Sequence, residues 1–164
     1  SSDVCSSDLR HQLGKNMKLT PLLLVFTLLS TITAPLYAAR VLTPETLEGG
    51  TIITPQDASR LPRVKIYDLR KTLNFAKGHL PGAVSLPFKP RSAKQVGFDD
   101  SKDKLNFSKL PSDPATPILF YSDGAYGWKS YKAAIIAIRN GFQHVYWLRE
   151  GFSGWKKSAL EVSR

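Results

Sequence analysis

Cysteine is almost absent from this sequence. One cysteine, Cys5, occurs among 164 residues. It lies in the opening stretch SSDVCSSDL, which shows no periodicity and resembles translated sequencing-adapter read-through. We therefore expect residues 1–16 to be a non-native leader and leave them out of the functional interpretation. The rest of the chain has no thiol, which excludes a disulfide, a thiolate nucleophile and a cysteine metal site there.

Long hydrophobic runs are also lacking. The apolar core Leu22–Leu29 is too short to span a bilayer, which takes about 20 residues. It follows Met17 and precedes small residues near Ala38, a pattern typical of a secretory signal peptide. We expect residues 17–38 to be this peptide, cleaved near Ala38, and the protein to be secreted or periplasmic. An uncleaved N-terminal anchor is the alternative; no other membrane association is expected.

Acidic residues and histidines are few. The chain has 23 Lys and Arg, 13 Asp and Glu, and three His, for a formal charge of +10. The charges are scattered and form no run, so a basic, soluble surface is the simplest interpretation. A small oxyanion or a protein partner is compatible with this balance, whereas export argues against nucleic acid. No metal site and no cofactor are expected, and the oligomeric state stays open.

Strand and helix patterns alternate after an extended N-terminal extension over residues 39–51. Residues 52–164 are expected to form one α/β domain with a central parallel sheet flanked by helices. The helix signals are Thr54-Pro55 as a start, KSYKAAIIAIRNGF ending at Gly141, and a short last helix. The expected strands are RVKIYDLR, Val84–Leu86, PILFY and HVYW. Residues 89–117 are expected to be loop, with a short helix near 103–110.

Two segments carry a family resemblance. DLRKTLNFAKGHLPGAVSLPF resembles the first signature of rhodanese-like domains, and ILFYSDGAYGWKSYKAAIIAIRNGFQHVYWLREGFSGW resembles the second, which holds the active-site strand and loop. The resemblance covers residues 52–157. It implies a rhodanese-like fold, in which the residue that ends the active-site strand is a cysteine that carries sulfur as a persulfide.

This sequence departs from the family at that residue. Ser122 stands in place of the cysteine, and a serine hydroxyl cannot carry a persulfide. Ordinary thiosulfate sulfurtransferase activity is therefore excluded. The loop is also longer: family members place an Arg five residues after the cysteine, while Lys129 comes seven after Ser122. The GWKSYKAA segment weakly resembles a periplasmic subfamily with a Cys-x-x-Cys-Trp loop, and Gly127 would stand where that loop has a cysteine.

The loop still has features of an anion site. A buried strand, a Gly-rich loop and a helix start direct backbone N–H groups toward one point. Lys129 favours an anion there and Asp123 opposes it. The two aromatic residues, Tyr126 and Trp128, could form a recognition patch or a lid over a filled pocket. The candidate anion-binding residues are Ser122, Asp123, Gly124, Ala125, Tyr126, Gly127, Trp128, Lys129 and Ser130.

Other polar residues are expected to support the structure. A serine nucleophile would need a positioned base, and the only histidines after residue 38 are His79, which the family resemblance assigns to bracing, and His144. Ser122 is therefore expected to be a harmless replacement whose hydroxyl caps a loop N–H. Asp68 and Arg70 are expected to tie the loop to the following turn, with a catalytic acid and an anion clamp as the alternative.

These features favour a catalytically inactive rhodanese-like domain that acts as an exported binding or accessory module through its altered loop. The alternative is a noncanonical sulfurtransferase-like or phosphatase-like enzyme that uses the loop without a cysteine. A retained anion site would favour the enzyme, and a loop plugged by Trp128 or Tyr126 would count against it. A remnant domain without function is a third possibility.

Overall fold

The computed structural model describes residues 40–164, so the expected leader and signal peptide lie outside the described residues. Among residues 40–164, no helix is long and apolar enough to cross a membrane. The strands are β1 (Thr51–Ile52), β2 (Lys65–Asp68), β3 (Ala83–Ser85), β4 (Ile118–Tyr121) and β5 (Val145–Leu148). The helices are α1 (Pro55–Arg60), α2 (Thr72–Lys77), α3 (Trp128–Arg139) and α4 (Gly151–Lys157).

All five strands form one parallel sheet in the order β1-β5-β4-β2-β3. The central strand β4 pairs with β2 on one side and β5 on the other, with Tyr121 opposite Asp68 and Leu148. Strand β4 is buried along its whole length, which explains why its sequence is a continuous apolar run. The expected α/β domain with a central parallel sheet is confirmed.

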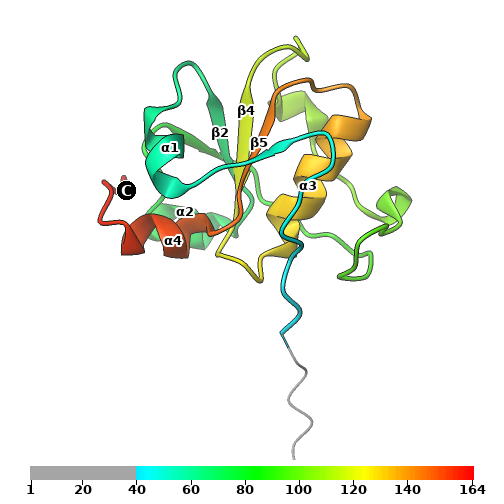
Figure 1. Cartoon of the computed structure of the whole chain (residues 1–164), viewed down its shortest axis with the longest axis horizontal. Coiled ribbons are helices and arrows are strands. Elements are labelled where there is room, and N and C mark those ends of the chain that lie inside the picture. The colour runs from blue at the N-terminus through cyan, green and yellow to red at the C-terminus, as the bar shows by residue number, and fades with distance from the viewer. Residues whose placement is uncertain (1–39) are drawn as a thin grey trace, which may run out of the picture. The chain divides into compact units, whose positions relative to one another are not determined.

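Helices cover both faces of the sheet (Figure 1). Along β4, Ile118 and Phe120 belong to the core on the α3 side, while Leu119 and Tyr121 belong to the core on the side of α1 and α4. This alternation follows from the two-residue repeat of a strand. Because all strands are parallel, the C-terminal ends of β2 and β4 meet at one edge, where the loop that follows β4 lies.

Local signals predicted several helix boundaries well. Thr54 caps α1 by accepting a hydrogen bond from the Asp57 N–H, and Pro55 is the first helical residue. Helix α3 ends at Arg139, shortly before Gly141, whose φ of 91° lies in the left-handed region. Helix α2 was not predicted, because its six residues bury no side chain and therefore show no apolar periodicity.

The short helix expected near 103–110 is present as a single 3₁₀ turn, Phe107–Lys109, and a second such turn, Asp100–Lys102, precedes it. Each is started by a side chain, Asp99 or Asn106, that accepts from the backbone N–H two residues later. Such local bonds compete with a continuous helix.

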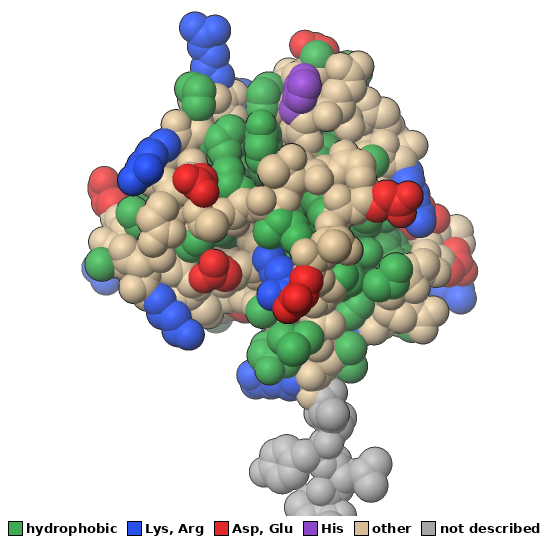
Figure 2. All heavy atoms as spheres, viewed as in Figure 1, with side chains coloured by type: hydrophobic (Ala, Val, Ile, Leu, Met, Phe, Trp, Pro, Cys, Tyr) green, Lys and Arg blue, Asp and Glu red, His purple; other side chains and the backbone are tan. Residues whose placement is uncertain are grey.

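The basic charge of the chain is spread over the surface. Figure 2 shows one face, on which Lys and Arg side chains are separated by acidic and hydrophobic ones.

Candidate functional site

Ser122 lies directly after β4, at the bottom of the loop formed by residues 122–127, called the serine loop below. The residue is 1 % exposed. Its hydroxyl donates to the Gly127 carbonyl at 3.1 Å and lies 2.9 Å from the Ser130 hydroxyl. Ser122 therefore does not cap a loop N–H as expected. Its hydroxyl contacts a carbonyl and another hydroxyl, so its one proton is used inside the protein.

The same bonds connect the serine loop to helix α3 and strand β5. The Ser130 hydroxyl donates to the Gly127 carbonyl at 3.0 Å and accepts from the Trp147 indole N–H at 3.0 Å. A Cβ at Gly127 would lie 2.1 Å from the Ser122 hydroxyl and 2.8 Å from the Gly124 carbonyl. Glycine is required at this position because the backbone passes directly over Ser122.

Neither of the two histidines in residues 40–164 is positioned to activate Ser122. His79 packs against Phe75, with ring centroids 3.8 Å apart, and its Nδ1 lies 3.0 Å from the Phe75 carbonyl. Its backbone also pairs with Ser163. His144 precedes β5 and is exposed, and its carbonyl accepts from the Ile118 N–H at the start of β4, the end opposite Ser122. The geometry gives a serine–histidine mechanism no general base.

Residues 123–126 of the serine loop have backbone N–H groups that no protein acceptor uses in the described part of the chain. The turn is closed by the Gly127 N–H, which donates to the Gly124 carbonyl at 2.7 Å. Unpaired backbone N–H groups in a turn are donors that a bound anion can use.

Lysines surround the opening of this loop. Lys89, Lys94 and Lys129 line a pocket of about 240 Å³ together with Asp123 and Tyr126. We call these three side chains the lysine mouth. Within the described part of the chain, none of the three forms an ion pair. Burial lowers the pKa of Lys129, and the charge of Asp123 partly offsets that decrease. The mouth thus carries three cations against one exposed carboxylate.

The two loop aromatics have different surroundings. Trp128 is 5 % exposed, packs edge-on against Tyr131 at 5.5 Å and donates its indole N–H to the Val41 carbonyl. Tyr126 is 49 % exposed. Trp128 therefore belongs to the core, while Tyr126 remains available to a ligand or partner.

The segment before β1 packs against the serine loop, which the sequence did not predict. The Thr43 N–H and hydroxyl both donate to the Ala125 carbonyl, at 2.9 and 2.7 Å. Arg149 also holds the segment by donating to the Thr43 and Pro44 carbonyls. These bonds use backbone carbonyls, so no residue pattern could reveal them. They limit the freedom of the loop.

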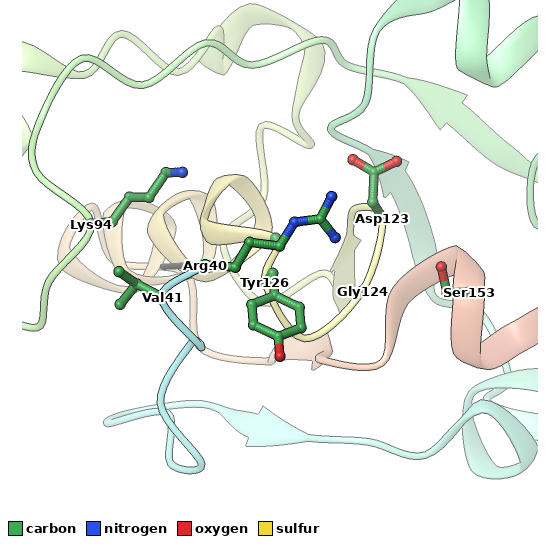
Figure 3. Close-up of a pocket in the computed structure, with 8 residues that line it drawn as sticks. Arg40, Val41, Lys94, Asp123, Gly124, Tyr126 and Ser153 are labelled. Carbon is green, nitrogen blue, oxygen red and sulfur yellow. The ribbon is translucent and has the colours of Figure 1, made fainter. Parts of the chain in front are cut away.

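This segment also adds a cation beside the loop. Figure 3 shows Arg40 extending toward Asp123, across a pocket of about 370 Å³ lined by Lys94 and Tyr126 as well.

Asp68 and Arg70 form a buried brace below the site. The Arg70 guanidinium binds both carboxylate oxygens of Asp68, at 2.6 to 3.0 Å, and its Nη2 also donates to the Gly78 carbonyl. The Tyr121 hydroxyl donates to Asp68 at 2.7 Å, and burial raises the pKa of Tyr121 well above its ordinary value. The pair joins the ends of β2 and β4 to the turn at Gly78.

Among residues 40–164, no group of three His, Cys, Asp or Glu side chains is placed to hold a metal ion.

Comparisons with known proteins agree with the fold described above. The family model for the rhodanese-like domain matches residues 54–158. The uncharacterized protein YibN of Escherichia coli K12 is 30 % identical over 117 residues, which cover 69 % of this chain and 72 % of YibN.

Two solved structures share the fold. The rhodanese-like domain of the Alr3790 protein from Anabaena sp. has a TM-score of 0.52 and 21 % identity, over 71 % of this chain and 80 % of that one. A thiosulfate sulfurtransferase from Pseudomonas aeruginosa has a TM-score of 0.51 and 20 % identity, over 70 % of this chain and 20 % of that one. At these identities the structures support the fold alone.

Proposed function

The chain belongs to the rhodanese-like domain family, and on that premise we propose that it is an accessory binding module that holds an anionic ligand at the serine loop without taking up sulfur. The observation that carries the proposal is the state of Ser122. Its side chain is 1 % exposed, donates its proton to the Gly127 carbonyl and lies against the Ser130 hydroxyl. A side chain in this state offers no nucleophile, and no thiol replaces it after residue 38.

Charge and free N–H groups support binding at the same place. The lysine mouth supplies three cations that form no ion pair in the described chain, and the loop supplies N–H groups without acceptors. An anion with several oxygen atoms could accept from both sets of donors. Small oxyanions such as thiosulfate, sulfite and phosphate fit a pocket of about 240 Å³.

The proposal includes export from the cytoplasm, on the basis of the signal-like segment Met17–Ala38. Recovery of the protein outside the cytoplasm with Ala39 as its first residue would support this part.

Enzymatic transfer of an oxyanion is the second candidate, favoured by the free N–H groups of residues 123–126. Such groups can stabilise charge that develops in a transition state as well as charge on a bound ligand. The two candidates differ in turnover: the binding module leaves its ligand unchanged, while the enzyme consumes it.

Replacing Lys129 with Gln is expected to weaken oxyanion binding at the serine loop by about tenfold, because a charge-assisted hydrogen bond is lost. The measurement is an NMR titration of the chain carrying Cys5→Ser, which removes the one thiol. Phosphate or thiosulfate is added at low ionic strength, and the amide shifts of residues 122–130 are followed.

Lys157→Gln serves as the matched control, since Lys157 is exposed on α4 and lines neither the serine loop nor the lysine mouth. This variant should bind with unchanged affinity. The absence of saturable shifts at residues 122–130, or equal affinities for the two Lys→Gln variants, would contradict the proposed site.

A further inference from the structure

A third pocket with cationic lining shares Asp123 with the two pockets beside the serine loop. It has a volume of about 540 Å³ and is formed by α2, α4 and the C-terminal residues. Figure 1 shows α2 and α4 beside each other on one side of the sheet. The cationic side chains that line this α2/α4 pocket are Arg70, Lys77, Lys156 and Arg164.

Arg70 gives this pocket a rigid donor. Its side chain is 4 % exposed and is held in place by Asp68 and by the ring of Phe152, which lies 4.0 Å from the guanidinium carbon. Nε and Nη2 donate to Asp68 and Gly78. Within residues 40–164, Nη1 donates to no protein acceptor. A guanidinium fixed on one side with donors remaining on the other is well arranged to bind an oxyanion.

The other lining groups complete such a site. Lys77 and Lys156 are exposed and form no ion pair in the described chain, so their ammonium groups can approach a ligand. Asn74 and Ser153 add an amide and a hydroxyl, while the apolar surface comes from Phe152 and Val162. Asp123 is the one acidic side chain in the lining.

We propose that the α2/α4 pocket binds a phosphate group, contacted by Arg70 Nη1, Lys77 and Lys156. Two sources share this chemistry, a free phosphate ion and the phosphate of a small organic monoester. The apolar surface of Phe152 and Val162 favours the ester, because its organic part can pack there. This inference does not depend on the function proposed for the serine loop.

The test is a titration of the full chain, carrying Cys5→Ser, with inorganic phosphate and separately with phenyl phosphate. Amide shifts in α2 and at Lys156 in α4 report on this pocket, and those of residues 125–130 report on the serine loop, because Asp123 and Ser153 line pockets on both sides. The double variant Lys77→Gln with Lys156→Gln should weaken binding at α2 and α4 by about tenfold or more. Lys157→Gln, which changes the same helix outside the pocket, should leave the affinity unchanged.

The outcomes separate the two proposals. The pocket is supported if the amide shifts in α2 and α4 saturate, with an affinity that falls in the double variant and is unchanged in Lys129→Gln. This conclusion holds whatever occurs at the serine loop. Tighter binding of phenyl phosphate identifies an ester site, and equal binding identifies a site for the free ion. The proposal is overturned by a lack of saturation at α2 and α4, or by a double variant that binds as tightly as Lys157→Gln.

Discussion

Replacing Asp103 with Asn is expected to lower the free energy of unfolding by about 3 to 5 kcal/mol, because it leaves the buried charge of Lys132 without a countercharge. The Lys132 side chain is 1 % exposed and that of Asp103 is fully buried, with Nζ and Oδ2 3.6 Å apart. Lys132 also donates to the Ser92 carbonyl at 2.8 Å. Burial lowers the pKa of Lys132, and the charge of Asp103 opposes that decrease.

The effect should be large because Asp103 also organises the segment before β4. Its carboxylate accepts from the Arg91 and Ser92 N–H groups and from the Ser92 hydroxyl. Burial alone would raise the pKa of Asp103, but these hydrogen bonds and the charge of Lys132 lower it overall. The segment around Arg91 and Ser92 has no regular strand or helix. The Asp103 carboxylate therefore attaches this segment to helix α3 through Lys132.

Urea unfolding followed by tryptophan fluorescence measures this change. The matched control is Asp100→Asn, which breaks the exposed Arg139–Asp100 pair at 2.8 Å and should cost less than about 1 kcal/mol. A loss in Asp103→Asn as small as that in the control would show that the buried pair contributes little to the stability of the fold.

Ser122→Cys, made in the Cys5→Ser chain, is expected to remain without sulfurtransferase activity. The new thiol would occupy a site that is 1 % exposed and faces the Gly127 carbonyl. A persulfide needs positive charge or N–H donors around its terminal sulfur, whereas burial beside a carbonyl raises the pKa of a thiol. The cysteine should therefore stay protonated and out of reach of thiosulfate.

The accessibility of this thiol can be measured directly with a disulfide reagent. Because reaction requires local opening, the folded variant should react at least about a hundredfold more slowly than the variant in urea. Rapid labelling of the folded variant, or thiocyanate formation from thiosulfate and cyanide above the level of the Ser122 chain, would show that the loop still supports sulfur transfer.

The fold was largely predictable from the sequence because its signals are local. The apolar run of β4, the Thr54 cap and the Gly141 stop each reflect the environment of a few neighbouring residues. The two family signatures predicted the order of the strands and helices along the chain. The rhodanese-like fold needed no information about distant contacts.

The environment of the site was not predictable in the same way. The contact between Thr43 and Ala125 joins residues 82 positions apart through a backbone carbonyl, and the ion pair between Asp103 and Lys132 joins two distant segments. The partner of the Ser122 hydroxyl depends on the path of the loop above it, which residue types alone do not specify. Exposure of Tyr126 and burial of Trp128 likewise depend on packing against residues 40–47.

Binding without transfer at the serine loop is tested most directly by one NMR experiment with thiosulfate and cyanide on the Cys5→Ser chain. The account predicts saturable amide shifts at residues 122–130, with thiosulfate intact and no thiocyanate formed. Formation of thiocyanate would contradict the claim that the loop does not transfer sulfur. Unchanged amide shifts at saturating thiosulfate would contradict the claim that it binds small oxyanions.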